Sequence, residues 1–169
     1  SGALAIAIAT MVPDARVTAV ESSDEALPWL RRNVAEQPAA VAERITVVAA
    51  DVTDATAMSA WFPTGSVDLV VSNPPYVPTA SPVDEEVRHD PPSAVFGGAN
   101  GMSVITPMVD AIATMLRPDG VVAIEHDDTT SAAVCSVLRQ TGVLVAVHAH
   151  DDLTGRPRFA TARHARMDR

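Results

Sequence analysis

The sequence predicts an α/β fold in which helices cover both faces of a mainly parallel sheet. Runs typical of strands alternate with runs typical of helices across residues 16–145, the order that produces parallel strands joined by crossover helices. Residues 143–150 and 158–164 then read as a closing pair of strands. Because 169 residues is an ordinary length for one domain, we expect a single domain spanning residues 1–169.

The first helix is expected directly after Gly2, in the small apolar run that begins at Ala3. A glycine at this position lets a ligand approach the backbone at a helix N-terminus. The next strand, residues 16–21, closes on Glu21, about 20 residues after the glycine, where dinucleotide-binding folds place a carboxylate on ribose hydroxyls. A carboxylate accepts hydrogen bonds from both hydroxyls. The alternative for Glu21 is a helix-capping or solvated acid.

A helix with Pro28 in its first turn is expected next. Its inward face is predicted to carry Leu27, Leu30 and Val34. Residues 45–52 form the following strand, which again ends on an acid, Asp51; the alternative for this residue is an ordinary loop acid. A short helix or turn at residues 58–62 follows, and Trp61 is expected in the core rather than in a site.

The stretch Asn73-Pro74-Pro75-Tyr76 follows directly on the apolar run at residues 67–71, which predicts a buried strand. The prolines end that strand, so Asn73 stands at its carboxyl end, where open α/β sheets bind ligands. The Asn73 amide offers an acceptor and donors, the carbonyls of the rigid turn are free to accept, and Tyr76 adds a flat apolar face with a polar tip. This set suits a planar group that bears an NH2. The alternative is a strand-ending turn with an Asn cap.

The second half of the chain continues the alternation. The elements expected there are a loop at residues 79–93, a glycine-dense turn at 96–101, a helix at 107–117, a strand at 121–125 and a helix that begins near 131. The strand ends at Glu125 and His126, at the same sheet edge as Asn73. For His126 we favour a structural or solvated role over a catalytic one.

Composition narrows the classes of partner. The formal net charge is −9, whereas a nucleic-acid binder usually presents a basic patch to phosphates. A protein or small-molecule substrate is therefore expected. Cys135 is the single cysteine, which rules out an internal disulfide and fits a reducing compartment. No apolar run approaches the roughly 20 residues of a membrane span.

The Asn-Pro-Pro-Tyr stretch after a strand resembles S-adenosylmethionine-dependent methyltransferases that act on amino groups. These include adenine-N6 DNA, guanine-N2 RNA and release factor glutamine methyltransferases. The chain is most similar to the last family, the HemK-like enzymes, across nearly its whole length. The features that carry this resemblance are Ser1-Gly2-Ala3-Leu4, Asn73-Pro74-Pro75-Tyr76-Val77-Pro78, the segment from Glu86-Val87-Arg88 to Pro91, Phe96-Gly97-Gly98-Ala99-Asn100-Gly101 and Asp152-Leu153-Thr154-Gly155-Arg156.

The resemblance implies a class I methyltransferase fold, which is Rossmann-like and has an antiparallel last strand. The family also has a helical N-terminal domain and a first strand that ends in an acidic, glycine-rich loop. Neither is found in these residues, so the chain is expected to be an incomplete catalytic domain, and by itself inactive or weakly active.

The resemblance further implies methyl transfer from S-adenosylmethionine to the side-chain amide of a glutamine in the Gly-Gly-Gln motif of release factors, in the cytoplasm. Asn73 and the Pro74 carbonyl would accept the two N–H bonds of that amide, and Pro75 and Tyr76 would complete the substrate site. The cofactor would contact Gly2, Glu21, Asp51, Val52 and Asn73, with Asp51 beside the adenine ring. No metal, nucleic acid or membrane is expected.

Two other functions remain open from the sequence. A nucleic-acid amino methyltransferase would present the same Asn73 geometry to a base edge. A non-catalytic remnant would retain the cofactor-binding fold without the reaction.

Overall fold

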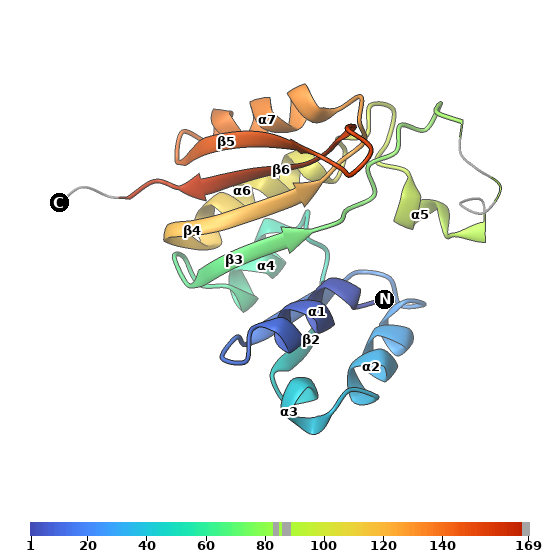
Figure 1. Ribbon diagram of the computed structural model, residues 1–169, viewed down its shortest axis with the longest axis vertical. Coiled ribbons are helices and arrows are strands. Elements are labelled where there is room, and N and C mark those ends of the chain that lie inside the picture. Colours follow the sequence, from blue (N-terminus) through green and yellow to red (C-terminus); the bar gives the residue numbers. More distant parts are fainter. Residues whose placement is uncertain (83–84, 86–88, 167–169) are drawn as a thin grey trace. The chain divides into compact units, whose positions relative to one another are not determined.

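The computed structural model describes residues 1–82, 85 and 89–166 (Figure 1). The chain comprises two compact units, Ser1–Ala57 and Met58–Arg169, and each contains its own sheet. The Glu86-Val87-Arg88 segment that contributed to the family resemblance lies outside the described residues.

The first unit is built on two parallel strands, β1 (Val17–Glu21) and β2 (Ile45–Ala49). Its helices are α1 (Ala3–Met11), α2 (Leu27–Ala35) and α3 (Ala39–Ala42). Parallel neighbours require a crossover connection, and α2 and α3 supply it. The register pairs Glu21 with Ala49, so the predicted strand ends lie side by side.

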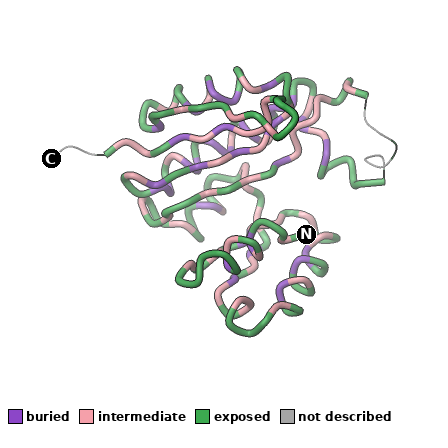
Figure 2. Tube along the Cα trace, in the orientation of Figure 1, coloured by how far each residue is buried: buried purple, intermediate pink, exposed green. Residues whose placement is uncertain are grey.

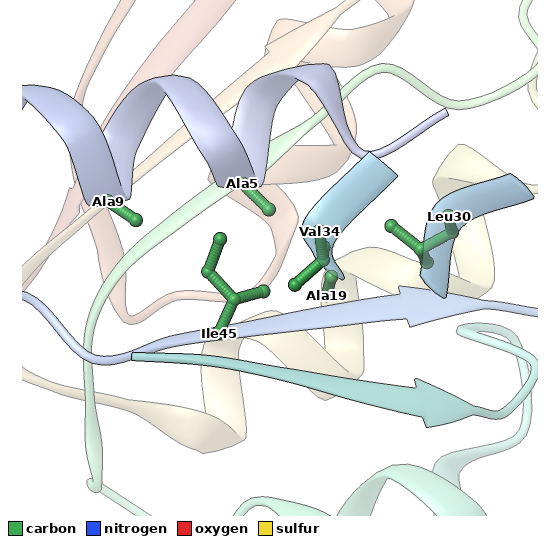
Figure 3. Packing of buried hydrophobic residues seen from close by; sticks show 6 residues of the cluster. All are labelled: Ala5, Ala9, Ala19, Leu30, Val34 and Ile45. Atoms are coloured by element: carbon green, nitrogen blue, oxygen red, sulfur yellow. The ribbon is translucent and has the colours of Figure 1, made fainter. Parts of the chain in front are cut away.

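A small apolar cluster holds the first unit together. It consists of Ala5, Ala9, Ala19, Leu30, Val34 and Ile45 (Figure 3). The two alanines of α1 point towards the strands, and their small side chains let the helix lie close to the sheet. Leu30 and Val34 are buried as predicted for the inward face of α2, with Pro28 in its first turn.

The second unit contains a four-stranded sheet in the order β3-β4-β6-β5 (Figure 1). Its strands are β3 (Val67–Ser72), β4 (Leu116–Glu125), β5 (Leu144–Asp151) and β6 (Pro157–His164). β3 and β4 run parallel, whereas β6 is antiparallel to both β4 and β5. The predicted closing pair of strands is therefore confirmed.

The helices of the second unit include α4 (Ala55–Trp61), which begins in the first unit, α5 (Pro92–Val95), α6 (Ile105–Met115) and α7 (Ser131–Gln140). Val109 and Ile112 of α6 and Val134 and Leu138 of α7 are almost completely buried. Figure 2 shows buried positions in purple along the helices and strands of this unit. These helices fix the sheet from which the Asn-Pro-Pro-Tyr turn leaves. No helix in the described part of the chain is long and apolar enough to cross a membrane.

Two burial predictions were wrong. β3 was expected to be buried, but Leu69 and Val71 are 46% and 36% exposed. The reason is position: β4 is the sole strand partner of β3 among the described residues, so β3 is an edge strand. Trp61 was expected in the core and is 54% exposed, because the seven-residue helix α4 buries Met58 instead.

Candidate functional site

The Asn73 side chain lies just beyond the end of β3. It is exposed, and it makes no hydrogen bond to any described residue. Pro74, next in the chain, is buried and anchors the turn, while its carbonyl oxygen accepts no hydrogen bond from the described residues. An Asn cap, the structural alternative for this stretch, is absent from the described structure. Two neighbouring acceptors are therefore available to a ligand.

A second segment holds this turn by its backbone. Val77 N donates to Val95 O at 3.0 Å, and Gly97 N donates to Val77 O at 2.9 Å. Two residues further on, Thr79 N donates to Gly98 O at 2.9 Å. The turn is thus hydrogen-bonded along its length to the glycine-dense segment, which fixes the path of the chain after Asn73.

The glycines in that segment are required by close backbone contact. A Cβ atom on Gly97 would lie 2.6 Å from Pro75 O, far inside van der Waals contact. Gly101 has φ +74° and its missing Cβ would collide with Tyr76 O. Sequence analysis predicted a glycine-dense turn here but assigned it no place in the site.

The Tyr76 hydroxyl is tied to the end of β4. Its Oη donates to Glu125 Oε1 at 2.9 Å. Burial raises the pKa of Tyr76 above its ordinary value of 10.0, and the hydrogen bond and negative charge of Glu125 raise it further, while Arg158 opposes them. The phenol is therefore protonated near neutral pH and acts as a donor.

Arg158, at the start of β6, connects this pair to the loop between β5 and β6. Its Nε lies 3.6 Å from Asp152 Oδ2. Asp152 Oδ1 accepts hydrogen bonds from Thr154 N at 2.8 Å, Thr154 Oγ1 at 2.6 Å and Arg156 N at 3.2 Å. The Thr154 hydroxyl and the Arg156 amide are the main reasons that the pKa of Asp152 falls to about 2. The sequence predicted this loop as the connection between the closing pair of strands, and the family resemblance includes it.

Two carboxylates share the carboxyl edge of the first sheet. Glu21 ends β1, and its backbone oxygen accepts from Ala50 N at 3.1 Å. Its Oε1 accepts from Ser23 N at 3.1 Å, and its other carboxylate oxygen has no partner among the described residues. Asp51 is exposed just beyond β2 and binds Thr53 N through Oδ1 at 2.8 Å. The next residue, Val52, is half-buried.

Gly2 precedes α1 with a left-handed backbone, φ 81°. A Cβ atom here would collide with the Leu30 side chain. Figure 3 shows Ala5 nearer than Ala9 to the arrowheads of β1 and β2, so α1 begins towards the carboxyl ends of these strands. The first unit therefore gathers four predicted cofactor contacts, Gly2, Glu21, Asp51 and Val52. The second unit carries Asn73, Pro74, Pro75 and Tyr76.

His126 follows Glu125 and is completely buried. Its Nδ1 donates to Asp127 O at 2.9 Å, whereas Nε2 has no partner among the residues that the structure describes. The buried position matches a structural role rather than a solvated one. Within the described ranges, no cluster of three or more His, Cys, Asp or Glu residues is arranged to hold a metal ion.

Comparison with known proteins identifies the family. The family model of the methyltransferase small domain matches residues 1–90, more than half of the chain. The chain belongs to the methyltransferase small domain family. Its curated relatives include release factor glutamine methyltransferases of Mycolicibacterium smegmatis, 48% identical over 163 residues, and of Corynebacterium glutamicum, 47% identical over 163 residues. Both alignments cover 96% of this chain, which confirms the resemblance to these enzymes.

This methyltransferase-family chain spans about half the length of the curated relatives it matches, 55% and 56% of the two above. Among solved structures it is similar to a predicted O-methyltransferase of Agrobacterium tumefaciens, with TM-score 0.68, 22% identity and coverage of 98% of this chain and 71% of that one. An S-adenosylmethionine-dependent O-methyltransferase of Thermotoga maritima gives TM-score 0.68 at 12% identity, covering 100% of this chain and 57% of that one. The predicted class I methyltransferase fold is confirmed.

Proposed function

We propose that this chain is the catalytic part of an S-adenosylmethionine-dependent methyltransferase that acts on a glutamine side-chain amide of peptide chain release factors in the cytoplasm. The observation that carries the proposal is the Asn73 amide beside the Pro74 carbonyl, at the carboxyl end of a strand, neither of them hydrogen-bonded to a described residue. The curated relatives named for this activity support it.

The two free acceptors match the two N–H bonds of a primary amide. Asn73 Oδ1 and Pro74 O would each accept one of them. An amide nitrogen is a poor nucleophile because its lone pair is delocalised into the carbonyl. Holding the nitrogen in line for attack can supply about 7–11 kcal/mol of a barrier in favourable cases, and two acceptors also favour the positive charge that develops on that nitrogen.

Tyr76 and Pro75 would complete the substrate site. The Tyr76 ring is half-buried, and its hydroxyl is committed to Glu125, so the ring face rather than the oxygen is left for a ligand. A flat apolar face suits the methylene groups of a glutamine side chain. The backbone contacts of Gly97 and Gly101 keep this part of the turn in place.

The first unit has residues that fit the cofactor. At the end of β1, Glu21 has one carboxylate oxygen without a partner in the described part of the chain, which suits a ribose diol. Asp51 is exposed at the end of the neighbouring strand, where it can accept from the adenine amine, and Gly2 and Val52 offer backbone and apolar contact. S-adenosylmethionine, when bound, supplies the methyl group from its sulfonium.

The test is methyl transfer from labelled S-adenosylmethionine by the natural polypeptide that contains residues 1–169. A purified release factor, total RNA and duplex DNA are offered separately. We expect label in the release factor alone, and peptide mass spectrometry should locate it on the glutamine of the Gly-Gly-Gln motif. Label in RNA or DNA would instead support an amino methyltransferase of nucleic acids, and cofactor binding without transfer would support a non-catalytic remnant.

A further inference from the structure

Four charged or polar side chains from separate parts of the second unit meet at one edge of its sheet. Tyr76 follows β3, Glu125 ends β4, Arg158 begins β6, and Asp152 opens the loop between β5 and β6. The strand register brings them together because Glu125 pairs with Phe159, the residue after Arg158. In addition, His126 N donates to Arg158 O at 2.9 Å, which fixes the Arg158 backbone to the end of β4.

Charge connects the Tyr76–Glu125 hydrogen bond to the Arg158–Asp152 ion pair. The Tyr76 hydroxyl donates to Glu125, and the pKa of Arg158 is raised, against the effect of burial, by its position beside Tyr76, Asp152 and Glu125. Arg158 and Asp152 side chains are 32% and 27% exposed. Solvent and salt therefore screen this pair less than they screen a fully exposed pair.

Fixing the Tyr76 hydroxyl has a consequence for the two free acceptors. Only Pro74 and Pro75 separate Tyr76 from Asn73, and each proline ring fixes its own φ. The turn therefore transmits a displacement of Tyr76 to Asn73 instead of absorbing it. Small displacements matter at such a site, since a misplacement of about 1 Å can lower a rate roughly 100-fold.

We propose that Glu125, Arg158 and Asp152 form a brace that positions Tyr76 and, through the two prolines, the acceptors Asn73 and Pro74. In this assignment, which rests on the proposed glutamine methylation, Glu125 is a positioning residue for methyl transfer. The loop Asp152–Arg156 is part of the same brace. Asp152 orders this loop through Oδ1 and pairs with Arg158 through Oδ2.

The same strand offers a matched control for a purely stabilising role. Arg163 of β6 forms an ion pair with Asp119 at 3.2 Å, near the start of β4 and away from Glu125. Arg163→Ala removes an arginine and an ion pair from the same two strands without touching the turn. It reports what loss of such a pair does to stability alone.

The kinetic test compares Tyr76→Phe, Glu125→Ala, Glu125→Gln and Arg163→Ala in the natural polypeptide that contains residues 1–169. We expect Tyr76→Phe and Glu125→Ala to lower kcat for release factor methylation about 10- to 100-fold, with the cofactor Kd unchanged. Glu125→Gln keeps an acceptor for the Tyr76 hydroxyl and should recover part of the loss. The double variant Tyr76→Phe/Glu125→Ala should be no slower than the slower single variant, and Arg163→Ala should keep the parent kcat.

A second readout needs no substrate. In the natural polypeptide that contains residues 1–169, incorporated fluorotyrosine gives a 19F resonance for position 76, which is assigned by its loss in Tyr76→Phe. Fluorotyrosine ionises at a lower pH than tyrosine, so its titration requires a less alkaline solution. Glu125→Gln should lower the pKa of this hydroxyl because it removes a negative neighbour, and Arg158→Ala should raise it because it removes a positive one.

The outcomes separate the two proposals. If neither substitution moves the 19F titration, the brace does not hold Tyr76 and the inference is overturned. If the titration moves but Tyr76→Phe and Glu125→Ala keep kcat within about twofold, the contacts exist and do not position the reaction. A parent polypeptide that methylates no release factor refutes the proposed function, while the titration still decides whether Tyr76 is held.

Discussion

The carbonyl oxygen of Tyr76 occupies the space that a side chain on Gly101 would need. This contact joins the Asn-Pro-Pro-Tyr turn to the glycine-dense segment, and it adds to the hydrogen bond from Gly97 N to Val77 O at 2.9 Å. The path of the turn is therefore set by backbone packing from one side and by the Tyr76 hydroxyl from the other.

Gly101→Ala should disturb both stability and the proposed reaction. Its left-handed φ of +74° costs a residue with a Cβ about 1–2 kcal/mol, and the added methyl would push Tyr76 away. Gly142→Ala is the matched control, since Gly142 has φ +72° and open space around it. We expect thermal unfolding to show that both variants are destabilised by backbone strain, Gly101→Ala more so because of the collision with Tyr76 O, and we expect a large loss of kcat for Gly101→Ala alone. Equal kcat values for the two would show that the contact with Tyr76 O is irrelevant to the reaction.

Asn73→Ala should lower the turnover number far more than it weakens cofactor binding. Loss of one preorganised polar contact in a transition state typically costs about 2.7–4 kcal/mol, or about 10²–10³ in rate. Asn73→Asp keeps an acceptor, loses both amide donors and adds a charge, so it tests geometry separately. Both variants should fold, because Asn73 is exposed and its side chain makes no hydrogen bond within residues 1–82, 85 and 89–166. Single-turnover methylation within a few fold of the parent would make this residue a structural one.

Glu21→Ala should weaken S-adenosylmethionine binding by leaving the ribose hydroxyls without their acceptor. An unpaired buried polar group costs about 1–3 kcal/mol, so we expect the Kd measured by calorimetry to rise roughly tenfold or more. Glu36→Ala is a suitable control within the same unit, because Glu36 is exposed and paired with Arg32 at 2.8 Å. The ribose assignment fails if the two variants bind the cofactor equally well.

Asp152 should make stability depend on pH in the acid range. Hydrogen bonds hold its pKa at about 2 in the folded protein, below the ordinary value of 3.8. A lowered folded pKa contributes stability that is present above pH 3.8 and is lost as the pH falls towards 2. In denaturant titrations, Asp152→Asn should therefore be less stable than the parent at neutral pH, and the difference should shrink in acid. Asp110→Asn, an exposed change on α6, controls for loss of a carboxylate; if it reproduces the same pH dependence, the effect does not belong to Asp152.

Local patterns in the sequence were enough for most elements of the fold. The periodicity of Leu27, Leu30 and Val34 predicted the buried face of α2, and the short β-rich runs that end on acids predicted β1 and β2 with Glu21 and Asp51 at one edge. The exposure of β3 could not be read in this way, because burial of a strand depends on its neighbours in the sheet. The same apolar run would be buried in the centre of a sheet and is partly exposed at an edge.

The candidate site was predictable only in part for a related reason. Asn73 and Pro74 carry their chemistry in a contiguous stretch, which the sequence displays directly. The Tyr76–Glu125 hydrogen bond joins residues 49 positions apart, and no local period encodes such a pair. The role of Gly101 could not be predicted either. A sequence does not distinguish a glycine needed for the φ angle of a turn from one needed to make room for a distant carbonyl.

The two free acceptors also bear on how many methyl groups a glutamine could receive. A primary amide has two N–H bonds, one for Asn73 Oδ1 and one for Pro74 O, and neither acceptor has another partner among the described residues. Once one hydrogen has been replaced by methyl, the product can satisfy only one of them and must place a carbon against the other. Under the proposed chemistry the product is a poorer ligand than the substrate, and the count of acceptors limits the reaction to a single methylation.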